Sequence, residues 1–170
     1  MFFTYTLRRA LALLPCLIMG LAHGQETPTP APASSAQVYQ ALSQALRSGN
    51  AALALQLAQS RLQTHPQDVQ ARFTEAAALG ELGQTQQALA SYERLTQRFP
   101  ELPEPHNNMA VLLAQDQRLD EALVALQTAV KLNPAYGTAW RNLADVYTAL
   151  ARQATARAEA NPTPQPVTRP

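Results

Sequence analysis

Small and large apolar residues recur along this chain at a fixed interval of 34 residues. The small positions form two series, which are Ala76, Ala110 and Ala144, and then Ala88, Ala122 and Ala156. Larger residues stand one helical turn after them, at Leu79, Leu113 and Tyr147 in the first series and at Tyr92 and Leu126 in the second. Small residues beside large ones let two antiparallel helices approach closely and fill the space between them. The pattern therefore predicts a series of antiparallel helix pairs.

Prolines divide the chain at the same interval. Three of them are 34 residues apart, at Pro66, Pro100 and Pro134. Because proline breaks helix interiors, each marks the end of one helix pair. Gly49 and Gly83 fall between the two helices of their pairs, where a helix C-terminus often needs a positive φ, whereas the third pair has Gln117 there. The expected helices span residues 36–48 and 50–64, 68–82 and 85–98, 103–116 and 119–132, with a terminal helix from about 137.

Composition supports an all-α fold. The helix formers Ala, Leu and Gln supply 75 of the 170 residues, whereas Ile occurs once and Val seven times. Strands favour β-branched and aromatic residues, so sandwiches, barrels and parallel sheets are excluded as fold classes.

This repeat resembles the tetratricopeptide repeat family. The matching motifs are Trp140-x2-Leu143-Ala144-x2-Tyr147, Ala88-x3-Tyr92…Pro100 and Ala122-x3-Leu126…Pro134. Arg72 and Glu75 depart from the pattern, since the family usually places Trp and Leu there. The resemblance implies an all-α, right-handed solenoid of antiparallel helix pairs over residues 36–160, with about three units and a C-terminal capping helix. The units are expected at about 36–66, 69–102 and 103–136, followed by a partial unit at 137–160.

The N-terminal segment has the order of an export signal. Arg8 and Arg9 precede an apolar run of 13 residues, and Ala22-His23-Gly24 provides small residues for cleavage before Gln25. The run is shorter than the ~20 residues of a spanning helix, so residues 1–24 are expected to be removed and to leave no stable membrane insertion. An uncleaved anchor and lipidation at Cys16 are the alternatives. A periplasmic or secreted bacterial protein is expected, with residues 25–35 as a Pro/Ala/Ser-rich linker and 161–170 as a Pro-rich tail.

Charge and candidate chemistry reduce the number of function classes that fit this sequence. Thirteen basic and 12 acidic residues leave a formal charge of +1, which provides no field for nucleic acid. Cys16 is the single cysteine, so a disulfide framework is excluded. His65 and His106 are two isolated histidines and are interpreted as structural. We expect no enzyme, catalytic residue, metal or cofactor, because no nucleophile–base pair or phosphate-binding loop occurs.

The first helix of each pair is expected to line a concave groove. The candidate peptide-binding residues are Tyr39, Phe73, Asn107, Asn108, Val111, Arg141, Asn142 and Asp145. Asn108 and Asn142 are one repeat apart, and an Asn amide can pair with both the C=O and the N–H of a peptide backbone. The pair resembles the asparagine ladder of O-linked N-acetylglucosamine transferases, which grips extended peptides. The alternative is that both are merely solvated polar residues. If they pair with a bound backbone, alanine at both positions is expected to leave stability level or higher.

Together these features predict a non-catalytic interaction module of the bacterial cell envelope. Its partner would be a protein or an extended peptide, as in an assembly or scaffold factor. The competing hypothesis is a structural protein that self-associates through the apolar end of the array as a homo-oligomer, without a peptide ligand.

Overall fold

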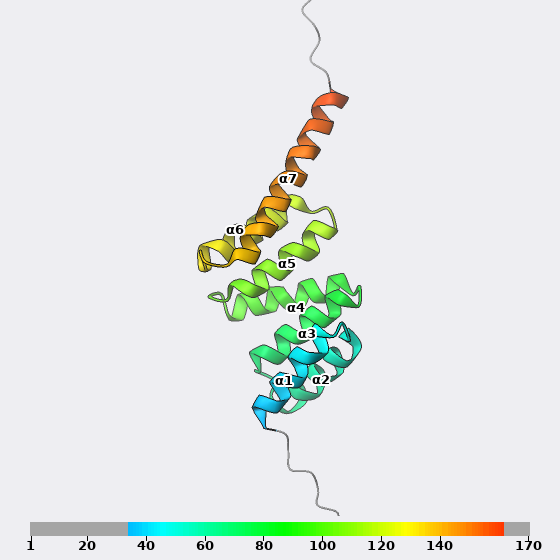
Figure 1. Cartoon of the computed structure of the whole chain (residues 1–170), viewed down its shortest axis with the longest axis vertical. Coiled ribbons are helices and arrows are strands. Elements are labelled where there is room, and N and C mark those ends of the chain that lie inside the picture. The colour runs from blue at the N-terminus through cyan, green and yellow to red at the C-terminus, as the bar shows by residue number, and fades with distance from the viewer. Residues whose placement is uncertain (1–33, 162–170) are drawn as a thin grey trace, which may run out of the picture. The chain divides into compact units, whose positions relative to one another are not determined.

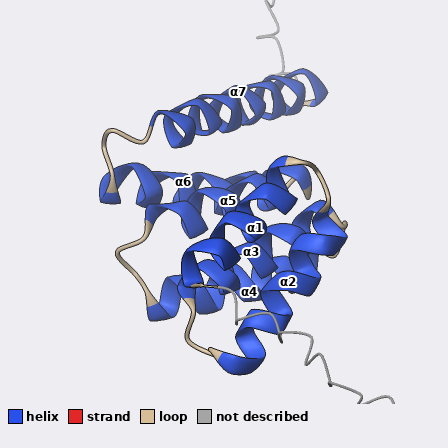
Figure 2. Cartoon of the chain, turned by 60° about the horizontal axis from the view of Figure 1, so that its bottom comes forward, coloured by secondary structure: helices blue, strands red, loops and turns tan. Residues whose placement is uncertain are grey.

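The computed structural model describes residues 34–161, and within them the chain is helical throughout, with short loops and no strand (Figures 1 and 2). The helices are α1 Ser35–Arg47, α2 Ala51–Thr64, α3 Val69–Glu81, α4 Thr85–Arg98, α5 Pro103–Gln115, α6 Leu119–Leu132 and α7 Gly137–Ala160. Every helix boundary predicted from the 34-residue interval lies within one residue of the observed boundary. The expected signal segment, and most of the expected linker and tail, lie outside the described residues.

The helices form an all-α solenoid of antiparallel pairs, as predicted. Consecutive helices pack against one another, and each first helix also contacts the first helix of the next pair: α1 with α3, α3 with α5, and α5 with α7. Because the first helices contact one another in series, they form one face of the array, and the second helices lie on the other side.

The turns inside the three pairs have the same geometry despite one difference in sequence. Gly49, Gly83 and Gln117 all have positive φ, at 70°, 74° and 61°. In the third turn the N–H of Gln117 bonds to the C=O of Ala114, and the N–H of Arg118 bonds to the C=O of Leu113. This is the bonding pattern of a Schellman cap, and a non-glycine residue can adopt it at some strain. The register therefore continues through the unit that lacks glycine.

The core follows the predicted small and large positions in the second and third pairs. Ala76, Ala88, Ala110 and Ala122 are fully buried, and Leu79, Tyr92, Leu113 and Leu126 lie with them in one cluster. The last members of the series differ. Ala144, Tyr147 and Ala156 are exposed, because α7 continues to Ala160 instead of turning into a second helix.

Candidate functional site

Two adjoining depressions lie on the first-helix face. One, of about 270 Å³, lies between α3 and α5, and the other, of about 350 Å³, lies between α5 and α7. Val111 and Gln115 line both of them, so the two form one groove, which we call the α3–α5–α7 groove. Its apolar floor includes Leu112 and Val146, and its polar rim carries amides and carboxylates.

A chain of side-chain hydrogen bonds runs beneath this groove. Asn142 Nδ2 donates to Asn107 Oδ1 at 2.9 Å, and Asn107 Nδ2 donates to Asn108 Oδ1 at 3.0 Å. Asn108 Nδ2 in turn donates to the phenol oxygen of Tyr92 at 3.1 Å. These three hydrogen bonds link helices of the second unit, the third unit and α7, and we call them the amide chain. Consecutive hydrogen bonds polarise one another, so the amide chain holds its side-chain amides in fixed orientations.

The amide chain separates the roles of the three asparagines. Asn107 is 3% exposed and uses both ends of its amide internally, so it supports the groove from below. Asn108 is half-buried, and its amide is also engaged at both ends. Asn142 is half-buried and donates through Nδ2, and no described residue donates to its Oδ1. The Asn142 oxygen is therefore the group in the amide chain that is best placed to accept a hydrogen bond from a ligand.

The amide chain changes the expected effect of alanine at these positions. Asn142→Ala should lower the free energy of unfolding by ~1–2 kcal/mol, because it leaves the buried Asn107 Oδ1 without its donor. Asn107→Ala combined with Asn142→Ala should lower it by less than the sum of the single changes, since both remove the same bond. Urea denaturation of the two single variants and the double variant measures this coupling. Additive losses would contradict the link between the two helices.

The other candidate residues are distributed around this groove. Val111 and Asp145 line it with Asn142, whereas Phe73 packs edge-to-face on Tyr92 with ring centroids 5.8 Å apart. Arg141 is exposed and donates to Thr138 Oγ1 at 3.2 Å, and it does not line either depression.

Tyr39 lies in a separate depression near the α2–α3 loop. Its hydroxyl donates to Asp68 Oδ2 at 2.9 Å, and the Arg61 guanidinium lies 5.7 Å from its ring centroid. Arg61 Nε donates to the same carboxylate oxygen at 2.7 Å. Burial raises the pKa of Asp68, but hydrogen bonds from Arg61, the Ala71 N–H and Tyr39 together hold that pKa below its ordinary value. This cluster is a structural link between the first and second units.

Sequence reasoning missed several groove residues that share one spacing. Glu81, Gln115 and Ala149 all line the groove, and each stands 15 residues after its repeat proline. Gln115 and Ala149 lie one helical turn beyond Val111 and Asp145, and Glu81 lies two turns beyond Phe73, so continuation of the helical spacing would have identified them.

The described groove lining has an acidic balance. Glu81 and Asp145 contribute carboxylates, and the described residues that line the two depressions include no Lys, Arg or His. At one wall, burial raises the pKa of the Tyr92 phenol to about 12, although the bond from Asn108 favours its ionised form. The phenol is therefore neutral near pH 7 and can act as the acceptor at the end of the amide chain.

A membrane-spanning helix and a metal centre are two further features that residues 34–161 could contain. None of the described helices combines the length and apolar character needed to cross a membrane. Among the same residues, no three His, Cys, Asp or Glu side chains come together in a way that could hold a metal ion.

Comparison with known proteins identifies the repeat. The family model described as tetratricopeptide repeat matches residues 103–136, which are the third helix pair of the solenoid. Residues 103–136 are a tetratricopeptide repeat, and the solenoid has the fold of tetratricopeptide repeat domains. Arrays of this family act as protein–protein interaction modules.

Similar proteins share this repeat in different settings. The "TPR repeat-containing thioredoxin TTL4" of Arabidopsis thaliana is 37% identical over 75 residues, which cover 44% of this chain and 11% of that protein. The first tetratricopeptide domain of human RPAP3 superposes with a TM-score of 0.63 at 15% identity, over 69% of this chain and 93% of that domain. The Yersinia enterocolitica secretion chaperone SycD, in complex with a peptide of the translocator YopD, has a TM-score of 0.59 at 20% identity, over 66% and 92% of the two chains. The likeness to these solved structures shows the fold alone.

Proposed function

We propose that this tetratricopeptide array binds an extended protein segment in the α3–α5–α7 groove, as a non-catalytic assembly or scaffold factor of the bacterial cell envelope. The observation that supports this most directly is the pair of adjoining depressions of about 270 and 350 Å³ that share Val111 and Gln115. Together they offer a continuous lining with apolar floor and polar rim on one face of the repeat.

The groove suits an extended peptide for two reasons. Successive side chains of an extended strand point in opposite directions, so alternate side chains can enter neighbouring depressions. The backbone groups between them need partners, and the Asn142 oxygen can accept an N–H while the Gln115 amide can pair with either backbone group. SycD, which has the same fold, holds a peptide of its translocator, and this supports the same type of ligand here.

Charge indicates which segments would bind. Glu81 and Asp145 give the groove a negative balance, so we expect neutral or basic segments to be preferred over acidic ones. The described lining has no Ser, Cys or His that could act as a nucleophile or transfer a proton near pH 7, and the proposal includes no catalytic step. The envelope location is supported by the export pattern of residues 1–24.

Val111→Glu should weaken peptide binding by at least ~10-fold, because it places a carboxylate in the shared wall of both depressions. Val111 is 36% exposed, so the fold should tolerate the change. Val124→Glu on α6 is the matched control, since Val124 is 63% exposed and lies outside this groove. The measurement is calorimetric affinity for peptides selected on the purified chain from a random display library.

The two valine variants separate the possible binding faces. Loss of affinity in Val111→Glu with unchanged affinity in Val124→Glu supports the groove. The opposite result would assign binding to the outer face of α5 and α6 and would overturn the proposal. A melting curve of each variant confirms that both remain folded.

A further inference from the structure

The last helix of the array, α7, exposes the face that α3 and α5 bury. In α3, Ala76 and Leu79 are 0% and 6% exposed, because they pack within their own helix pair, and α5 buries the equivalent residues in the same way. The equivalent residues of α7, Ala144 and Tyr147, are exposed. Helix α7 has 24 residues where α3 and α5 have 13, and it extends past the other helices instead of turning back (Figure 1).

The uncovered face of α7 is a regular apolar stripe. Its members alternate in spacings of four and three residues, which places them on one side of the helix. They are Trp140, Ala144, Tyr147, Ala151, Ala154 and Ala158, and all six are exposed. The neighbouring solvent face is polar, with Arg141, Asp145, Arg152 and Glu159. We call the six residues the α7 stripe.

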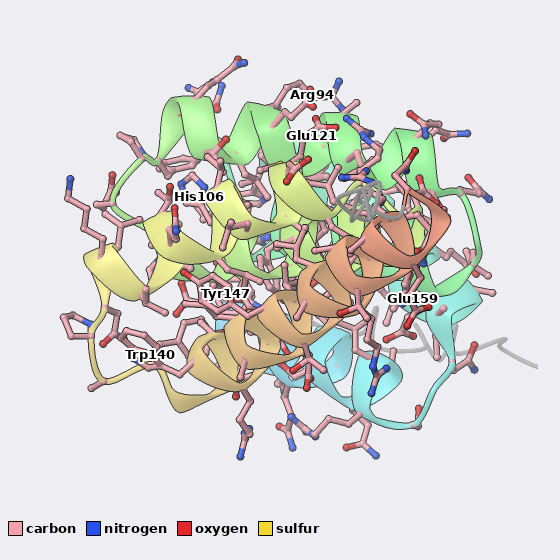
Figure 3. All side chains as sticks on the ribbon, turned by 90° about the horizontal axis from the view of Figure 1, so that it is seen from above. Arg94, His106, Glu121, Trp140, Tyr147 and Glu159 are labelled. Carbon is pink, nitrogen blue, oxygen red and sulfur yellow. The ribbon has the colours of Figure 1, made fainter. Side chains whose placement is uncertain are left out.

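The two aromatic rings of the stripe are already held in place. Trp140 Nε1 donates to the C=O of Pro134 at 2.9 Å, and Tyr147 Oη accepts from Gln127 Nε2 at 3.3 Å. Trp140 and Tyr147 nevertheless remain 49% and 50% exposed, along the flank of α7 next to α6 (Figure 3). Covering these rings would remove apolar surface from water without leaving their polar atoms unpaired, which is the condition for a favourable contact.

Two copies of the α7 stripe fit one another when they run in opposite directions. Its large residues, Trp140 and Tyr147, lie in the first half, and the second half holds only alanines. When two copies of α7 align antiparallel, Trp140 faces Ala158 of the second copy, and Tyr147 faces Ala151 of the second copy. Each large residue then meets a small one, as in the helix pairs inside the array, and Ala144 meets Ala154 between them. A foreign helix that packs antiparallel on α7 would need large residues in its first half and small residues in its second half to fit as well.

We propose that the α7 stripe is the dimer interface of this protein, in which a second copy of α7 packs antiparallel on the first. Both copies contribute the same residues, so the contact is isologous and closes at two subunits. The second copy occupies the position that a second helix occupies in the complete units. The inference depends on the α7 stripe alone and stands whether or not the α3–α5–α7 groove binds a peptide.

The extent of the stripe indicates a weak dimer. Trp140 to Ala158 spans roughly 27 Å at 1.5 Å per residue. A strip of that length and about 10 Å wide is well below the ~800 Å² per partner of a standard stable interface. We therefore expect reversible exchange between monomer and dimer, with a dissociation constant in the micromolar range or above.

Sedimentation velocity over a wide concentration range tests the proposal. The full chain is expressed with its own N-terminus and purified as the cell processes it, so that the parent and the variants share the same N-terminal segment. Ala151→Glu should raise the dimer dissociation constant at least ~10-fold, because it places a charge against the apolar stripe near the two-fold axis. Ala156→Glu is the matched control on the same helix, since Ala156 is exposed but lies on the polar side between Arg152 and Glu159.

Trp140 gives a second readout because it is the single tryptophan of the chain. Its emission should shift to shorter wavelength with increasing concentration in the parent and in Ala156→Glu, and not in Ala151→Glu. A parent that remains monomeric to millimolar concentration would overturn the proposal. A dimer that is retained in Ala151→Glu, or weakened equally in Ala156→Glu, would overturn it as well, since the contact would then lie elsewhere.

Discussion

Tyr92→Ala should lower the free energy of unfolding by about 3–5 kcal/mol, the largest loss expected for a single change in this array. Tyr92 is 2% exposed and lies in the main core cluster between the second and third units. Its ring also meets Phe73 edge-to-face, and its hydroxyl ends the amide chain. The substitution removes all three contributions and leaves a cavity. Because a short array unfolds cooperatively, one urea transition followed by circular dichroism should report the loss.

Tyr92→Phe separates the hydroxyl from the ring. It removes only the acceptor for Asn108 and should cost ~1 kcal/mol near pH 7. Burial raises the pKa of Tyr92 to about 12 in the folded chain, above its ordinary value near 10, so this group's contribution is present below pH 10 and lost as the pH rises towards 12. The parent should therefore lose more stability than Tyr92→Phe between pH 10 and 12. Equal losses for Tyr92→Ala and Tyr92→Phe at pH 7 would show that the ring does not carry the packing assigned to it.

Asp68→Ala should lower the free energy of unfolding by about 2 kcal/mol, mainly through the lost N-cap of α3. Asp68 is the N-cap of α3, where it accepts from the Ala71 N–H at 3.0 Å. It also pairs with Arg61 at 2.7 Å, and the side chains of Arg61 and Asp68 are only 13% and 4% exposed. Removal of the carboxylate leaves a helix end uncapped and the half-buried Arg61 guanidinium without its anion. The same urea titration measures the loss.

Asp68→Asn is the matched control, because Asn is also a good N-cap but carries no charge. Its loss at pH 7 should be smaller than that of Asp68→Ala. The pKa of Asp68 is below its ordinary value in the folded chain, so the charge contributes stability above about pH 4 and this contribution disappears as the pH falls further. The difference between the parent and Asp68→Asn should therefore shrink as the pH falls below about 4. A constant difference between them from pH 7 to pH 3 would contradict the role given to the ion pair.

Helix positions were predictable because the information for them is local. The 34-residue interval, the repeat prolines and the small residues of each unit act within a single helix pair and its neighbours. Gln117 shows that the helix positions do not depend on one residue type, since the turn keeps a positive φ of 61° without glycine. The run-on of α7 was also foreseeable, because no glycine interrupts the sequence after Tyr147.

Roles within the groove were less predictable, because they depend on contacts between units. Asn107 and Asn142 are 35 residues apart in sequence, and Tyr92 and Asn108 are 16 apart, yet each pair is joined by a hydrogen bond. Burial of Asn107 at 3% exposure makes it the centre of the amide chain, which its place in the repeat does not indicate. The spacing rule that proposed Asn108 and Asn142 as equivalent could not show that one amide is engaged at both ends.

The sequence by itself determined that this chain is a tetratricopeptide solenoid, where each helix lies, and which face the first helices share. Those features follow from periodic packing, which repeats with the sequence. The tertiary structure decided which residues of that face remain available. Neighbouring residues of a helix point about 100° apart, so Asn142 enters the amide chain while Arg141 beside it points to solvent. Whether a polar side chain can meet a ligand depends on the partners it already has, and those partners come from other helices.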